Sequence, residues 1–192
     1  MSDAKAKIRK GTLYNRRMLS PEVWTDRVTR VQELILNFIK EKKVTCCHVF
    51  LPIARNKEFD SWDLVKKLND HGIEVQLSVS DFATFKMNHF IYHRDLRFES
   101  NKFDIPEPVG GKAADISKVE MILIPLLASD KKGNRIGYGK GFYDRLLSDL
   151  LSKPLKVGVN LAPLFDHFPF SEDHDIKLDF CITPNQIYNC ND

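Results

Sequence analysis

The sequence lacks any long apolar run, and it is poor in cysteine. No stretch approaches the roughly 18 apolar residues that a membrane-spanning helix needs. Residues 4–10 alternate small and basic side chains, without the apolar core of a secretion signal. The cysteines, which are Cys46, Cys47, Cys181 and Cys190, form no C-x-x-C metal spacing. We therefore expect a cytoplasmic protein with reduced, structural thiols and no membrane contact.

A large surplus of one charge is also missing. The 29 basic and 26 acidic side chains leave a net charge of only +3. Domains that bind nucleic acid usually have a pI above about 9 and a clustered basic stripe, so no nucleic-acid partner is expected. A chain of 192 residues with 43% hydrophobic content can bury its own core. We expect a single domain over residues 1–192, acting as a monomer.

The first half of the chain predicts alternating helices and strands. Residues 1–19 are basic and favour a helix. Ser20 is a good N-cap for a second helix with Pro21 at its first position, and an apolar stripe at three- and four-residue steps follows. An apolar run at 44–51, a helix capped by Asp60 and a second run at 73–79 give a β-α-β unit, which predicts parallel pairing.

The second half continues this alternation. Its apolar runs predict strands at residues 86–92, 121–124, 157–160 and 180–183. Residues 101–112 are rich in proline and glycine and favour a loop, whereas leucines at three- and four-residue steps predict a helix from Tyr143 to Leu151. Together these elements predict an α/β fold, a three-layer α/β/α domain with a mostly parallel central sheet.

Residues 133–141, Gly-Asn-Arg-Ile-Gly-Tyr-Gly-Lys-Gly, form a glycine-rich segment between a buried strand and a helix. Glycines let backbone N–H groups approach a ligand, and the following helix adds partial positive charge at its start. Arg135 and Lys140 add full charges, so the segment suits a polyanion. It matches neither the P-loop nor the dinucleotide pattern, and a flexible surface turn remains the alternative interpretation.

Acidic and basic residues elsewhere could complete such a site. Asp144 lies just inside the following helix, and an acidic cluster occupies residues 172–175. Mg²⁺ takes one or two carboxylates together with phosphate oxygens and water. Lys5 and Arg9 are four residues apart and share one helix face. Each has an alternative interpretation: Asp144 could simply start the helix, residues 172–175 could form a solvated loop, and Lys5 and Arg9 could lie on a solvated basic face.

The run from Gly133 to Asp144, G-N-R-x-G-x-G-K-G-F-Y-D, resembles the signature of the 5-formyltetrahydrofolate cyclo-ligase family. Other family elements follow in the expected order. They are the basic K-x-x-x-R pair Lys5 and Arg9, a strand and loop with Leu51 and Glu58, I-P-x-P at 105–108, an apolar run ending in proline at 121–125, and H-D-x-x-x-D at His174, Asp175 and Asp179.

This resemblance implies an ATP-dependent ligase of one-carbon metabolism. ATP would phosphorylate the formyl oxygen of 5-formyltetrahydrofolate, and the folate's N10 would attack the activated carbon. Phosphate would then leave, which gives 5,10-methenyltetrahydrofolate and ADP. The implied partners are 5-formyltetrahydrofolate and ATP, and the implied cofactor is Mg²⁺.

The resemblance also assigns roles to individual residues. The implied catalytic residues are Lys140 and Arg135. The implied ATP-binding residues are Lys5, Arg9, Gly133, Asn134, Arg135, Ile136, Gly137, Tyr138, Gly139, Lys140, Gly141, Phe142 and Tyr143. The implied folate-binding residues are Leu51, Glu58, Tyr138, Gly139, Lys140, Gly141 and Phe142, and the implied Mg²⁺ ligands are Asp144 and Asp175. Tyr138 replaces the arginine or small residue of many members, and Phe142 replaces a common tyrosine.

Two other classes of function fit parts of the sequence. A sugar-phosphate or CoA enzyme could use the same scaffold and basic loop, but it has no evident need for Lys5 and Arg9. A non-catalytic module could bind RNA through the basic first helix, although the near balance of charge argues against it.

Overall fold

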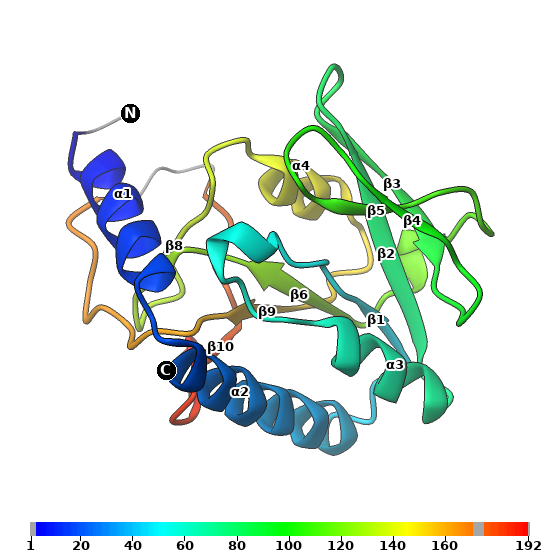
Figure 1. Cartoon of the computed structure of the whole chain (residues 1–192), viewed down its shortest axis with the longest axis horizontal. Helices are drawn as coiled ribbons and strands as arrows, with labels where there is room; N and C mark the ends of the chain where they lie inside the picture. The colour runs from blue at the N-terminus through cyan, green and yellow to red at the C-terminus, as the bar shows by residue number, and fades with distance from the viewer. Residues whose placement is uncertain (1–2, 171–174, 192) are drawn as a thin grey trace.

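The computed structural model of the chain describes residues 3–170 and 175–191. A seven-stranded sheet runs through its centre in the order β11-β10-β9-β6-β1-β2-β3 (Figure 1). These strands are β1 (Cys46–His48), β2 (Glu74–Asp81), β3 (Lys86–Ile91), β6 (Met121–Pro125), β9 (Leu155–Val159), β10 (Phe180–Ile182) and β11 (Ile187–Asn189). The inner five strands pair in parallel, and β3 and β11 join the edges antiparallel.

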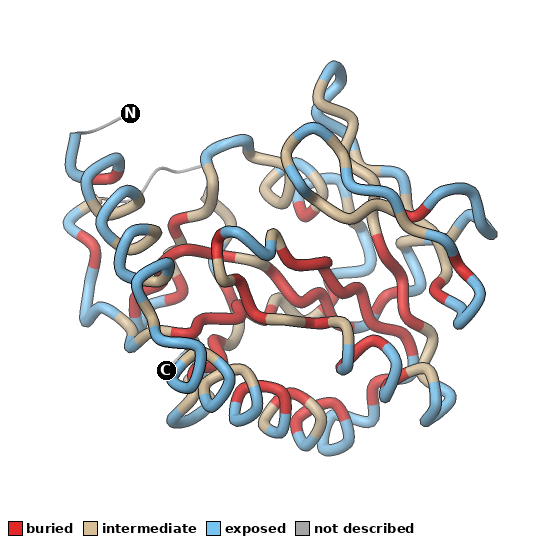
Figure 2. Tube along the Cα trace, in the orientation of Figure 1, coloured by how far each residue is buried: buried red, intermediate tan, exposed pale blue. Residues whose placement is uncertain are grey.

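Helices cover both faces of this sheet. The two helices α2 (Pro21–Glu41) and α3 (Trp62–Asp70) pack on one face, and α4 (Phe142–Asp149) packs on the other. The side chains of β6 alternate between the two faces of the sheet. Met121 and Leu123 belong to the cluster under α2 and α3, and Ile122 and Ile124 belong to the cluster under α4. Figure 2 shows buried residues concentrated in the inner strands of the sheet, whereas the edge strands β3 and β11 contain none. The predicted three-layer α/β/α fold with a mostly parallel sheet is confirmed.

The first helix, α1 (Asp3–Arg17), packs against the 3₁₀ turn η1 (Ala54–Asn56) and the short strand β7 (Ala128–Ser129). It leads into α2 through the predicted cap, in which Ser20 Oγ accepts a hydrogen bond from the Val23 N–H at 3.3 Å. This docking matters for function because it places one face of α1 beside the loops at the carboxyl ends of β1 and β6.

Several elements differ from the prediction in extent. Strand β1 covers only Cys46–His48 of the predicted run 44–51. Helix α4 ends at Asp149 rather than Leu151, since Leu150 is already extended and Leu151 is 96% exposed. The predicted loop at 101–112 contains β5 (Pro106–Pro108), which pairs with β4 (Phe98–Ser100). A second 3₁₀ turn, η2 (Ile116–Lys118), precedes β6.

The glycine-rich segment contains an unpredicted strand as well. Strand β8 (Arg135–Ile136) pairs antiparallel with β7 (Ala128–Ser129), so that the start of the segment closes a hairpin. The sequence signal for it is too short to recognise, because each strand has only two residues. Within the described residues, no helix has the length and apolar character needed to cross a membrane.

Candidate functional site

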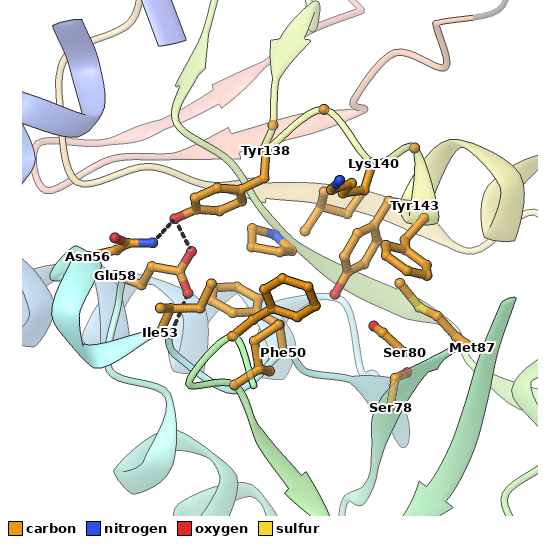
Figure 3. Close-up of a pocket in the computed structure, with 18 of the residues that line it drawn as sticks. Phe50, Ile53, Asn56, Glu58, Ser78, Ser80, Met87, Tyr138, Lys140 and Tyr143 are labelled. Atoms are coloured by element: carbon orange, nitrogen blue, oxygen red, sulfur yellow. Dashed lines mark hydrogen bonds between the residues drawn. The ribbon is translucent and has the colours of Figure 1, made fainter. Parts of the chain in front are cut away.

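A cavity of about 550 Å³ lies beyond the carboxyl ends of β1 and β6, where ligands bind in open α/β sheets (Figure 3). Its walls come from α1, the loop after β1, the β2–β3 hairpin, the glycine-rich segment and the start of α4. The structure brings most of the predicted site residues together in this cavity: Lys5, Arg9, Leu51, Glu58, Arg135, Gly137, Tyr138, Gly139, Lys140, Gly141, Phe142, Tyr143, Asp144 and Asp175.

Three predicted site residues do not line the cavity. Gly133 and Asn134 form the turn of the β7–β8 hairpin, where Asn134 donates to the buried Asp130 carboxylate at 2.8 Å. Ile136 is buried against Ala128 and belongs to a small hydrophobic cluster. Gly133, Asn134 and Ile136 are therefore part of the fold, whereas Arg135 and the residues from Gly137 onward line the cavity.

The two aspartates of the H-D-x-x-x-D element lie in different parts of the structure. Asp175 lines the cavity, whereas Asp179 pairs with Lys156, near the start of β9, at 2.8 Å. His174 and its neighbours at 171–173 lie outside the described residues. Of the predicted acidic cluster, the structure thus places one carboxylate at the site.

One end of the cavity is cationic. Lys5 Nζ lies 3.1 Å from Asp175 Oδ2, and Arg9 Nε donates to the Gly137 carbonyl at 2.8 Å. Arg135 donates to the Asp144 carboxylate and to the Ile176 carbonyl. These contacts place cations from α1 and from the glycine-rich segment around one space, as a polyanion requires.

Asp144 and Asp175 are the carboxylates at this end, and both are partly exposed. The described residues contain no group of three or more His, Cys, Asp or Glu side chains arranged around a metal. Mg²⁺ does not need such a cage, because it keeps several waters and takes one or two carboxylates with phosphate oxygens. The donor set therefore fits a magnesium ion that binds together with a phosphate group.

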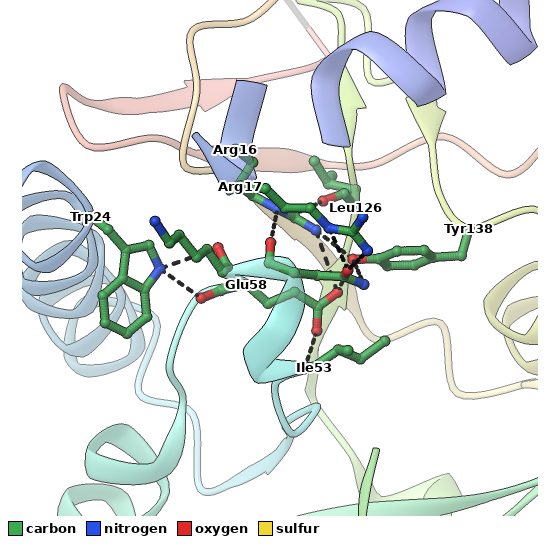
Figure 4. Close-up of polar contacts among 9 residues, drawn as sticks. Arg16, Arg17, Trp24, Ile53, Glu58, Leu126 and Tyr138 are labelled. Atoms are coloured by element: carbon green, nitrogen blue, oxygen red, sulfur yellow. Dashed lines mark hydrogen bonds and ion pairs between the residues drawn. The ribbon is translucent and has the colours of Figure 1, made fainter. Parts of the chain in front are cut away.

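The other end of the cavity holds a buried carboxylate. Glu58 is only 3% exposed, and its Oε2 accepts a hydrogen bond from the Ile53 N–H at 2.6 Å (Figure 4). The Tyr138 hydroxyl donates to Oε1. Burial is the largest influence and raises the pKa of Glu58, although the Ile53 N–H, Tyr138 and Arg16 act to lower it. Each oxygen of the carboxyl group thus accepts a hydrogen bond, Oε2 from the Ile53 N–H and Oε1 from Tyr138.

Aromatic side chains from three segments form one wall of the cavity. The Phe82 ring, at the tip of the β2–β3 hairpin, lies 4.3 Å from the Phe103 ring and 5.1 Å from the Phe142 ring. The sequence reasoning identified only Phe142 of these. Alternation along a hairpin does not show which aromatic residues fold back over a distant helix, so no sequence signal could have found Phe82 and Phe103.

Polar groups beneath this wall were also not predicted. His48 Nε2 lies 2.6 Å from Ser78 Oγ, which lies 2.9 Å from His89 Nδ1. Burial, with a smaller contribution from His89, lowers the pKa of His48 to about 3, so its ring is neutral at pH 7. The cavity thus joins a cationic end to an enclosed end with aromatic, hydroxyl and carboxylate groups.

Comparisons with known proteins identify the family of the chain. The model of the 5-formyltetrahydrofolate cyclo-ligase family matches residues 1–184. The chain belongs to this family. The predicted membership is confirmed, and with it the prediction that the protein is a cyclo-ligase enzyme.

Similar relatives span almost the whole chain. The 5-formyltetrahydrofolate cyclo-ligase of Escherichia coli K12 is 28% identical, over 90% of this chain and 96% of its own. That of Mycolicibacterium smegmatis is 29% identical, over 95% of both chains. The solved structure of the Aquifex aeolicus 5,10-methenyltetrahydrofolate synthetase is 29% identical and matches with a TM-score of 0.80, over 98% of this chain and 93% of that one.

Proposed function

We propose that the protein converts 5-formyltetrahydrofolate to 5,10-methenyltetrahydrofolate with ATP as the phosphoryl donor, releasing ADP and phosphate. The observation that carries this proposal is a single cavity whose lining includes four cations, which define its cationic end, and also aromatic rings and the buried Glu58, which define its enclosed end. Phosphoryl transfer needs charge neutralisation and positioning, which the first end supplies. A folate needs an apolar wall and a few fixed polar groups, which the second end supplies.

At the cationic end, Lys5, Arg9, Arg135 and Lys140 hold the phosphates of ATP, with Tyr143 packed beside the nucleotide. Gly139 and Gly141 have φ of 83° and 69°, and this left-handed backbone favours glycine. The two residues turn the segment into the start of α4, whose unpaired N–H groups favour an anion. Asp144 and Asp175 would hold Mg²⁺, which supplies further neutralisation of phosphate charge when bound.

At the enclosed end, Leu51, Glu58, Tyr138 and Phe142 contact the folate. The formyl oxygen attacks the γ-phosphorus, the bond to the ADP oxygen breaks, and ADP leaves. Arg135 and Lys140 stabilise the charge that develops on the transferred group. N10 then attacks the activated carbon and loses its proton, and the carbon–oxygen bond to phosphate breaks. All of these groups belong to one chain, which agrees with a monomeric enzyme.

The test is turnover of the purified protein. With Mg·ATP and 5-formyltetrahydrofolate, we expect the absorbance of the methenyl product to appear with one phosphate released per product. No absorbance change with active substrates would contradict the proposal. Calorimetry with ATP separates a sugar-phosphate or CoA enzyme, which should show no heat of binding. A gel shift that survives moderate salt without turnover would favour an RNA-binding module instead.

A further inference from the structure

Arg16 connects four segments at the enclosed end of the cavity, although the sequence offers no reason to single it out. Its side chain is only 10% exposed. Nε donates to the Asn56 carbonyl at 2.8 Å, and Nη1 donates to the Leu126 carbonyl at 3.1 Å (Figure 4). Nη2 donates to the Tyr138 hydroxyl and lies 3.8 Å from Glu58 Oε1.

These contacts use the arginine in a way that lysine cannot reproduce. The guanidinium is planar and carries donors in a fixed fork, so it can satisfy several acceptors in different directions at once. Here the acceptors belong to η1, to the chain after β6 and to the glycine-rich segment. Arg16 therefore fixes the distance between these segments as well as the charge beside Glu58.

Arg16 also shares a helix face with the cations of the other end. It follows Arg9 by seven residues and Lys5 by eleven, so that the three side chains form one stripe along α1. All three side chains contact the loops around the cavity. One face of a single helix thus touches the ATP end through Lys5 and Arg9 and the folate end through Arg16.

We propose that Arg16 is a positioning residue for the folate end, holding the Glu58 carboxyl group in a fixed orientation and the Tyr138 hydroxyl toward Glu58. The inference rests on the proposed function, in which Glu58 contacts the folate. Arg16 itself is satisfied by protein groups, so its effect on the folate passes through Glu58 and Tyr138. A change at Arg16 should weaken folate binding more than ATP binding.

The charged and titratable groups around Glu58 decide its protonation. Arg16 approaches from α1, Tyr138 from the glycine-rich segment and Tyr143 from α4. The neighbouring Lys57 directs its amine to the Leu19 carbonyl. Arg16 is thus the cation that acts on Glu58, and its loss should raise the pKa of this carboxyl.

The experiment compares Arg16→Met with Arg17→Met. Arg17 is the matched control, because it also donates to η1, through Asn56 Oδ1 at 2.5 Å, but within the described residues it makes no hydrogen bond or ion pair with Glu58 or Tyr138. For Arg16→Met we expect the KM for 5-formyltetrahydrofolate to rise about tenfold or more, as the loss of a charge-assisted contact implies. The KM for ATP should stay within about twofold, and Arg17→Met should change neither constant by more than that.

The pH profile supplies a second readout that a purely structural role would not move. The acid limb of kcat/KM for the folate should shift to higher pH in Arg16→Met, because Glu58 then becomes protonated at higher pH. Arg16→Lys keeps the charge but loses the planar fork, so its acid limb should shift less than that of Arg16→Met. It also serves as the test variant if Arg16→Met does not fold.

Glu58→Gln separates the two levels of the proposal. A raised folate KM in Glu58→Gln, together with unchanged folate KM and acid limb in both Arg16 variants, would overturn the role of Arg16 alone. A normal folate KM in Glu58→Gln would overturn the role of Glu58 in the proposed function, and the inference with it. In the double variant Arg16→Met/Glu58→Gln, the two effects should be less than additive.

Discussion

Gly133 and Gly137 lie four residues apart in the same glycine-rich segment, but their surroundings differ. A Cβ at Gly133 would lie 2.6 Å from the Leu178 carbonyl oxygen and 3.1 Å from Cys190 Cβ. A Cβ at Gly137 would meet nothing within 4 Å. Gly133 is required by close packing and by its φ of 79°, whereas Gly137 leaves its space open to the cavity.

The same contrast extends to the two halves of the segment. The half before Gly137 is fixed by the fully buried Asp130, which accepts the N–H groups of Asn134 at 2.9 Å and Phe168 at 2.9 Å. The half from Gly137 onward lines the cavity. The rigid hairpin holds Arg135 at the junction, and Arg135 in turn contacts Asp144. One sequence signature therefore contains both a support and a binding surface.

The largest effect that separates the two halves is expected for Gly133→Ala. The new methyl group would enter backbone that cannot move away, in a left-handed conformation that alanine rarely adopts. Overpacking and backbone strain each cost about 1–3 kcal/mol, so we expect the free energy of unfolding to fall by about 3 kcal/mol. Urea unfolding followed by circular dichroism measures this loss. A stability equal to that of the wild type would show that the hairpin does not depend on Gly133.

Lys140→Ala tests the second half. Lys140 is exposed at the cavity, so we expect the fold to remain intact while ATP binding weakens and kcat/KM for ATP falls about 100-fold, as for removal of one transition-state donor. Lys132→Ala is the matched control, since Lys132 is an exposed lysine on the hairpin. Equal loss of activity in both variants would mean that the halves do not differ in function.

The difference between the halves also shows which features of the protein can be predicted from its sequence. The stripe of α2, the N-cap at Ser20 and the buried strand β6 follow from local periodicity, and the structure contains all three. The resemblance assigned Gly133, Asn134 and Ile136 to ATP because they belong to the signature. The surroundings of these residues depend on contacts that the signature does not show: Gly133 packs against Leu178, which is distant in sequence, and Asn134 bonds to the buried Asp130 within the hairpin.

Long-range contacts explain the other residues that the sequence did not indicate. The sequence does not distinguish Arg16 from the other basic residues of α1, and its contacts follow only from the packing of α1 against η1. Phe82 and Phe103 joined the cavity wall only through the folding of the β2–β3 hairpin and the loop after β4. Periodicity along the chain describes which face of an element is buried, but it does not describe which elements meet.

Asp144→Asn should have a smaller effect than Lys140→Ala and a different one. Removing one of two proposed carboxylate ligands should raise the Mg²⁺ concentration for half-maximal rate about tenfold, since even indirect partners of a metal contribute that much. Asp149→Asn, at the exposed end of the same helix, is the control and should leave the Mg²⁺ titration unchanged. An unchanged titration for Asp144→Asn would remove Asp144 from the proposed metal site.

The smallest effect is expected for Gly137→Ala, and this variant tests the comparison most directly. Its methyl group would point into open space, and the Gly137 carbonyl can still accept from Arg9. The free energy of unfolding should therefore change by less than about 0.5 kcal/mol, as at sites without special contacts. ATP affinity, measured by calorimetry, should fall by less than about threefold, because a single methyl displaces no proposed ligand of phosphate. A stability loss as large as that of Gly133→Ala would instead mean that the whole segment, and not only its first half, is held by the fold.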